Sequence, residues 1–200
     1  MADLGVFAAS LVEAGAGRAV IVFGRGFAGS SAHQALAQKF RVIVASDSAL
    51  APRALGEAAA AWAADQGLES VGFVGVGEAA AAALWAASAA GERANAVVLA
   101  APVGLPVRDD ADDPDGLRPL LTAIAAPKAV LLGTVDRTAP PDAAERFRKA
   151  LSKCNVVLVF GAGQDIVGER PGAFANVAGD FLDRQARFAF MTESLALDPG

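Results

Sequence analysis

Short apolar runs rich in Val, Ile and Phe alternate along the chain with longer Ala-rich stretches, and this alternation constrains the fold more than any other feature. The runs are continuously apolar, which is typical of parallel strands covered on both faces. We predict strands at Ala19–Phe23, Arg41–Ala45, Val71–Val76, Ala96–Ala100, Ala129–Gly133 and Val156–Phe160. Ala favours helices, and we predict them at Ser30–Lys39, Arg53–Gln66, Glu78–Ala90, Leu117–Ala125, Asp142–Ser152 and Ala173–Arg187. The pattern predicts an α/β fold with a doubly wound, mostly parallel sheet of about six strands and helices on both faces.

The composition fits one domain over residues 1–200, with 188–200 as a C-terminal tail. At 54% hydrophobic residues, a chain of this length can bury a large core. The 17 Lys and Arg residues are outnumbered by 22 Asp and Glu residues, so we expect neither nucleic acid nor a membrane surface as a partner. No apolar run reaches the roughly 18 to 20 residues of a membrane span, and the N-terminus lacks a basic signal region, so we expect a cytoplasmic protein.

We expect no metal ion and no cofactor. Cys154 and His33 are the single cysteine and histidine, so the chain cannot build a Cys/His zinc site or an internal disulfide. Residues 108–118 carry five Asp residues and superficially resemble a calcium loop. Aligning Gly116 with the glycine of such a loop places Ala111 at the first ligand position and Thr122 at the bidentate glutamate, so we interpret the segment as a solvated loop.

A G-x-G-x-x-G motif follows the first predicted strand. It consists of Gly24, Gly26 and Gly29, and the next predicted strand leads to Asp47. In dinucleotide-binding folds such glycines let backbone amides approach the pyrophosphate, and an acidic residue binds the ribose. The motif alone therefore favours NAD or FAD binding, which we keep as one alternative.

Segments along nearly the whole chain resemble the α/β-hydrolase superfamily. The sequence Gly75-Val76-Gly77-Glu78-Ala79 stands between a predicted strand and helix, where that superfamily has its G-x-S-x-G nucleophile elbow. RGFAGSS, RVIVASD, GLESVGFVGVGEAAAAAL, ERANAVVLAAPVG, IAAPKAVLLGTVDRTAP and GAGQDIVGERPGAFANVAGDFL resemble its other conserved segments. The last two are the most specific, because a dinucleotide-binding fold has no reason to contain them.

The resemblance implies a degenerate catalytic site. It places Gly77 at the nucleophile, Gln164 at the triad histidine and Asp136 at the triad acid. Arg25 replaces the histidine that precedes the oxyanion loop, and Phe27 stands at the oxyanion-hole position. Because glycine has no nucleophile and a glutamine amide cannot shuttle a proton, the resemblance predicts that the fold is kept and the reaction is not.

Other polar residues near these positions have structural interpretations. Ser30 and Ser31 suit an N-cap, and we expect His33 to be a surface or satisfied histidine and Cys154 an inert buried thiol. Glu78 suits the positive end of a helix dipole, and it could also pair with Arg25 to plug the former oxyanion hole.

We call these positions the vestigial site; they are Arg25, Phe27, Gly77, Glu78, Asp136 and Gln164. We expect this site to be open, because the roughly fifteen residues between Ala101 and Leu117 are too few for a helical lid. Arg25, Glu78, Asp136 and Gln164 would then line a cleft that is open to water, which favours a protein surface over a small ligand, although a small-ligand site at the strand ends stays an alternative.

Our first hypothesis is a cap-less, catalytically degenerate protein that acts as a binding, regulatory or structural subunit. An active esterase or thioesterase with a displaced nucleophile, such as a water activated by Glu78 or Asp136, is the second. A dinucleotide-binding protein is the third. The tail carries apolar residues that either pack on their own domain or dock on a partner, and we expect a homo-oligomer or a protein partner; these residues are Phe188, Phe190, Met191, Leu195 and Leu197.

Overall fold

The computed structural model describes residues 7–8, 11–45, 50–108, 110–114 and 116–184, and within them the chain forms one seven-stranded sheet. The strand order is β1-β3-β2-β4-β5-β6-β7. β1 pairs antiparallel with β3, and the remaining neighbours pair in parallel. The strands are β1 (Leu11–Ala14), β2 (Ala19–Phe23), β3 (Arg41–Ala45), β4 (Val71–Val76), β5 (Ala94–Ala100), β6 (Lys128–Gly133) and β7 (Cys154–Val159).

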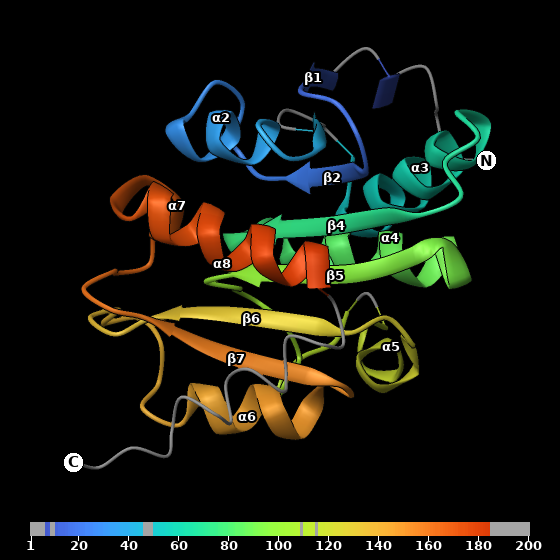
Figure 1. The fold of residues 1–200 in the computed structure, drawn as a ribbon. Helices are drawn as coiled ribbons and strands as arrows, with labels where there is room; N and C mark the ends of the chain where they lie inside the picture. Colours follow the sequence, from blue (N-terminus) through green and yellow to red (C-terminus); the bar gives the residue numbers. More distant parts are fainter. Residues whose placement is uncertain (1–6, 9–10, 46–49, 109, 115, 185–200) are drawn as a thin grey trace.

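Helices cover both faces of the sheet (Figure 1). One face carries α2 (Ser31–Ala37), α7 (Ile166–Glu169) and α8 (Pro171–Arg184). The other carries α3 (Pro52–Asp65), α4 (Ala80–Ala90), α5 (Arg118–Ala123) and α6 (Ala143–Ala150). Two short 3₁₀ turns, η1 (Gly77–Ala79) and η2 (Gly91–Arg93), precede and follow α4. This is the predicted α/β architecture.

The core lies in two layers, one on each side of the sheet. Along β2, Val20 and Val22 pack toward α2 and α8, whereas Ile21 and Phe23 pack toward α3 and α4. Successive side chains of a strand point to opposite faces, so a strand that is covered on both faces must be apolar throughout. This two-sided burial explains the continuous Val and Ile runs of the sequence.

The structure differs from the predicted elements in several places. It adds β1, whose four residues are too few and too exposed for a clear apolar run, and the one-turn helix α7. Helix α4 begins at Ala80 because the chain first makes the turn η1, and α5 is shorter than predicted. Asp47 and the tail 188–200 lie outside the described residues, so the tail's role in assembly stays a prediction. No described helix is long and apolar enough to cross a membrane.

Candidate functional site

The turn after β4 has a positive φ at its first residue, Gly77, which bears no side chain. Gly77 has a φ of +58°, which residues with a side chain rarely adopt. A Cβ built on Gly77 would meet no atom within 4 Å, so the surface above the turn is open. The carbonyl oxygen of Gly77 accepts a hydrogen bond from the Val103 amide at 3.1 Å, which joins the turn to the loop after β5. Gly77 therefore supplies no nucleophilic side chain at this turn.

The carboxylate of Asp136, in the loop after β6, organises its own turn. Its Oδ1 atom accepts hydrogen bonds from the Thr138 amide at 2.8 Å and from the Thr138 hydroxyl at 2.7 Å. The Ala139 amide donates to the same oxygen at 3.3 Å. This pattern is typical of an Asp that closes a loop through its side chain.

Gln164 is exposed in the loop between β7 and α7. The amide of its neighbour Gly163 donates to Glu169 Oε2 at 2.7 Å, and Asp165 Oδ1 accepts from the Gly168 amide at 2.9 Å. These contacts fix the loop at both sides of Gln164. The residue therefore stands where a side chain can reach the strand ends, but its neutral amide offers no base.

Asp136 and Gln164 line the same hollow, which we call the strand-end pocket. It has a volume of about 360 Å³ and lies beyond the carboxyl ends of β5 and β6. Its lining comprises Ala101, Pro102, Val103, Gly104, Leu105, Val107, Arg108, Leu132, Asp136, Thr138, Ala139, Pro140, Ala143, Arg146, Phe147 and Gln164. Among these described residues Thr138 bears the only hydroxyl, and none is Ser, Cys, His or Lys. Most of the wall is apolar, with a few polar groups at the rim.

Arg25 and Glu78 line a different hollow of about 290 Å³, which we call the elbow hollow. The four expected cleft residues are thus divided between two hollows and do not share one. None of the ion pairs in the described part of the chain joins Arg25 to Glu78, so the expected plug is not formed. Both side chains are exposed, and an ion pair between exposed side chains contributes little to stability because water already solvates both charges.

Phe27 belongs to the core and does not face either hollow. Its side chain is 1% exposed and packs against the ring of Phe174, with centroids 5.8 Å apart and nearly perpendicular planes. Its amide donates to the Gly24 carbonyl at 3.4 Å. An oxyanion hole needs a free amide at this position, so the structure gives Phe27 a structural role.

Two backbone amides of the Gly24 to Gly29 loop, those of Phe27 and Gly29, donate hydrogen bonds within the protein. The Ser30 amide donates to the Phe27 carbonyl at 3.1 Å, and the Gly29 amide donates to Nδ1 of His33 at 2.9 Å. The Ser30 hydroxyl accepts from the His33 amide at 3.1 Å and caps α2, as predicted. Since pyrophosphate binding uses such amides, this loop does not favour a dinucleotide.

His33 and Cys154 lie outside both hollows. His33 is 5% exposed, and burial lowers its pKa, so it is a buried residue and not a surface one. Cys154 is half-buried and not buried as predicted, and partial burial raises the pKa of its thiol to about 11, which disfavours the reactive thiolate. No set of three or more His, Cys, Asp and Glu side chains in the described residues is arranged to hold a metal ion.

Sequence reasoning missed three residues of interest. Arg108 and Arg146 line the strand-end pocket, yet one sits in an acidic loop and the other on an amphipathic helix, where the sequence marks them only as solvated charges. Lys128 is fully buried at the start of β6. Its position before an apolar run gives no sign of burial, and a lysine before a strand is ordinarily exposed.

Comparisons with known proteins identify the fold. Neither a scan of protein-family models nor a search of curated proteins matched the sequence. Solved structures do match. An α/β hydrolase enzyme from a sediment metagenome of the Mar Chica lagoon, Morocco, superposes with a TM-score of 0.68 at 18% identity, covering 87% of this chain and 94% of its own.

Two esterases match similarly. Carboxylesterase CesB of Bacillus subtilis gives a TM-score of 0.68 at 15% identity, covering 86% of each chain. A thermophilic esterase from Thermogutta terrifontis gives 0.69 at 16% identity, covering 87% of this chain and 92% of its own. The chain therefore has the α/β-hydrolase fold, and likeness at these identities extends to the fold alone.

Proposed function

We propose that this α/β-hydrolase-fold chain is a catalytically inactive binding protein that takes a small ligand in the strand-end pocket. One observation carries the proposal: the pocket is formed beside an elbow that bears Gly77 and a loop that bears Gln164. A pocket at the strand ends thus lies beside two positions that offer neither a nucleophile nor a base, which supports binding without hydrolysis.

The missing chemistry is specific. Covalent hydrolysis needs a nucleophilic side chain and a base within hydrogen-bond reach of it. The Thr138 hydroxyl is the one candidate nucleophile among the described lining residues, and it donates a hydrogen bond to Asp136 Oδ1 within a local turn. Oδ1 of Asp136 already accepts three hydrogen bonds, which hold the pair in place as a structural unit. Binding without turnover fits this arrangement.

The shape of the pocket supports a small ligand. Ligand pockets are commonly about 300 to 1,000 Å³, mostly apolar, with a few polar groups that fix orientation. The strand-end pocket, at about 360 Å³, lies at the small end of that range. Leu105, Leu132 and Phe147 form its apolar wall, while Asp136 and Gln164 are available for hydrogen bonds.

The proposal is tested by an NMR titration of the protein with a set of short-chain acids, amides and alcohols. We expect amide shifts to change at Val103, Ala143 and Phe147, which line the pocket. Val103→Trp should fill the pocket and abolish the changes. Val135→Trp is the matched control, because Val135 is also an exposed valine but does not line the pocket.

Shift changes that avoid the pocket, or that survive Val103→Trp, would contradict the assignment of the site. Hydrolysis of a short-chain ester that Asp136→Asn abolishes would instead support the alternative of an enzyme with a displaced nucleophile.

A further inference from the structure

A third hollow adjoins the strand-end pocket and is rich in positive charge; we call it the basic hollow. It has a volume of about 500 Å³ and lies between the loop after β5 and helix α6. Four cationic side chains line it, Arg108, Arg118, Arg146 and Lys149, against one acidic side chain, Asp110. In a chain with a net charge of −5, such a concentration of cations is unexpected.

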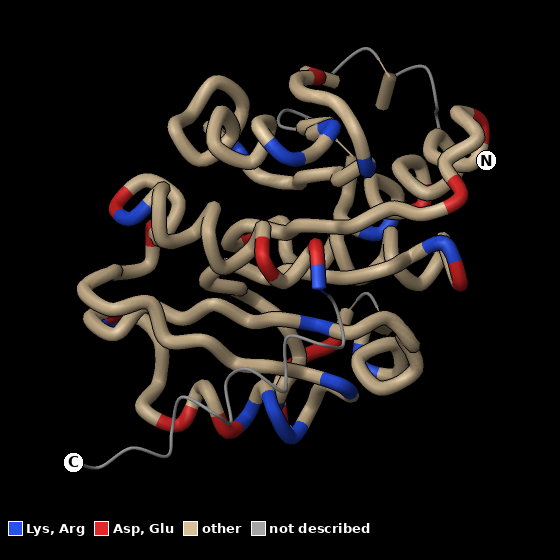
Figure 2. Tube along the Cα trace, in the orientation of Figure 1, with Lys and Arg blue, Asp and Glu red and all other residues tan. Residues whose placement is uncertain are grey.

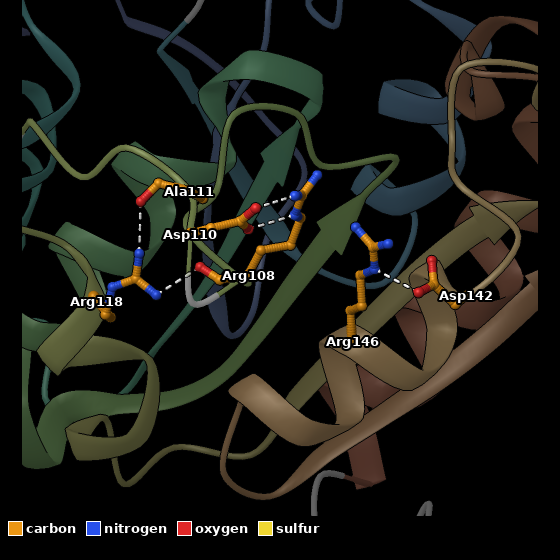
Figure 3. Close-up of polar contacts among 6 residues, drawn as sticks. All are labelled: Arg108, Asp110, Ala111, Arg118, Asp142 and Arg146. Atoms are coloured by element: carbon orange, nitrogen blue, oxygen red, sulfur yellow. Dashed lines mark hydrogen bonds and ion pairs between the residues drawn. The ribbon is translucent and has the colours of Figure 1, made fainter.

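Carboxylates neutralise only part of this charge. Arg108 Nε donates to Asp110 Oδ1 at 2.7 Å, and Arg146 Nε pairs with Asp142 Oδ2 at 2.8 Å (Figure 3). Two of the four lining cations, Arg108 and Arg146, are thus in ion pairs, and no ion pair of the described residues includes Arg118 or Lys149. The carboxylate of Asp113, in the same loop, accepts hydrogen bonds from the Leu117 and Arg118 backbone amides. Asp109 and Asp115 lie outside the described residues and are not counted.

Arg118 contributes an uncompensated charge, because both of its guanidinium contacts are to neutral groups. Its Nη1 donates to the Arg108 carbonyl at 2.6 Å and its Nη2 to the Ala111 carbonyl at 2.7 Å (Figure 3). These bonds hold the guanidinium against the loop. Lys149, one turn after Arg146 on α6, is exposed and makes no ion pair within the described part of the chain.

The basic hollow and the strand-end pocket share a wall. Val107, Arg108 and Arg146 line both. Figure 3 shows the side chains of Arg108 and Arg146 extending into the same space, one from the loop and one from α6. A ligand in the pocket would therefore have an apolar environment on the side of Leu132 and Phe147, and two guanidinium groups at its other end.

We infer that the ligand of the strand-end pocket is an organic anion, with an apolar body in the pocket and a carboxylate or phosphate at the arginines. This inference rests on the proposed function and specifies its ligand. A guanidinium presents paired donors that match both anionic groups.

The existing ion pairs do not block this site. The side chains of the Arg108 and Asp110 pair are 53% and 67% exposed, and exposed pairs contribute little to stability. A ligand anion can therefore take the place of Asp110 at small cost. Figure 2 shows that α6 carries residues of both charge signs. One of its cationic residues, Arg148, offers a matched control for a substitution of Arg146. Arg148 is exposed on α6 but lines neither hollow.

The test is calorimetric titration with octanoate, octyl phosphate, the neutral octanamide and inorganic phosphate. We expect the two amphiphilic anions to bind about tenfold or more tightly than octanamide, since a charge-assisted contact accounts for at least that factor. Arg146→Gln should remove this preference, whereas Arg148→Gln should keep it. The relative affinities of octanoate and octyl phosphate identify the natural headgroup.

Each remaining outcome overturns a distinct statement. Equal binding of octanamide and octanoate would overturn the anion preference and leave the pocket proposal intact, whereas no binding of any amphiphile would overturn both. Inorganic phosphate binding as tightly as octyl phosphate would show that the apolar body makes no contribution. An equal loss in Arg148→Gln would show general charge attraction and no site.

Discussion

The two ends of strand β6 hold polar groups in contrasting ways. At the amino end, Lys128 is fully buried, and its Nζ donates to the carbonyl oxygens of Ile124 at 2.7 Å, Ala126 at 3.0 Å and Ser152 at 2.9 Å. At the carboxyl end, β6 leads to Asp136, which is half-buried at the rim of an open pocket.

The difference separates a polar group whose hydrogen bonds are all made inside the fold from polar groups that line an open pocket. Burial lowers the pKa of Lys128 to about 8, and such a shift in a buried residue can mark a functional site. Here the ammonium donates hydrogen bonds to three carbonyl oxygens, which matches its three N–H donors. Lys128 also lines none of the three hollows described above. The polar groups that remain free for a ligand lie at the other end, where the lining is open.

The largest effect is expected from Lys128→Met, which keeps the bulk but removes the ammonium. Three carbonyls would lose their donor, and we expect a loss of about 3 to 5 kcal/mol in the free energy of unfolding. Urea denaturation measures it. Lys149→Met, on exposed α6, is the control and should change stability by less than about 0.5 kcal/mol. A loss below about 1 kcal/mol for Lys128→Met would mean that the three bonds do not form.

The carboxyl end is tested by Gly133→Ala, at the last residue of β6. An added Cβ would lie 2.2 Å from the carbonyl oxygens of Ala162 and Gly163, in the loop that carries Gln164. We expect a cost of about 1 to 3 kcal/mol from overpacking, together with a changed NMR signal of the Gln164 side-chain amide. At Gly172, on α8, the space around an added Cβ is empty. Gly172→Ala should be harmless, and an equally harmless Gly133→Ala would contradict this packing.

Gly77→Ser examines the elbow. The φ of +58° should cost about 1 kcal/mol for any residue with a Cβ, while the open space adds no clash. Gly77→Ala should therefore cost the same as Gly77→Ser in urea denaturation. A neutral or stabilising effect of both would show that the turn lacks the elbow conformation.

The smallest effect concerns His33, away from β6. Burial lowers its pKa below the ordinary 6.5, so the unfolded chain binds the proton more readily. Its contribution to stability is present above pH 6.5 and is lost as the pH falls toward the folded-state pKa. Stability measured from pH 7 to pH 5 should fall less steeply for His33→Gln than for the unaltered chain. Identical slopes would show that His33 does not titrate differently on folding.

The sequence was sufficient to predict the fold and the positions of the site loops. Continuous apolar runs determined six parallel strands, and the segments around Gly77 and Asp136 were placed at the strand ends, as observed. The division of the expected cleft was not predictable, because which side chains line a hollow depends on packing between elements distant in sequence. The positions of Arg108 and Arg146 in the pocket lining could not be predicted for the same reason, since the wall that the strand-end pocket shares with the basic hollow forms only on folding.

Covalent labelling tests whether the protein presents an activated nucleophile anywhere in the chain, as the proposed loss of catalysis requires that it does not. The intact protein is incubated with a fluorophosphonate probe, and its mass is measured. We expect an unchanged mass, because the turn after β4 bears Gly77 and no hydroxyl, and the strand-end pocket holds no Ser, Cys, His or Lys among its described lining residues. Stoichiometric addition of the probe, at Ser30, Ser31, Thr138 or any other residue, would show an activated nucleophile and would contradict the claim.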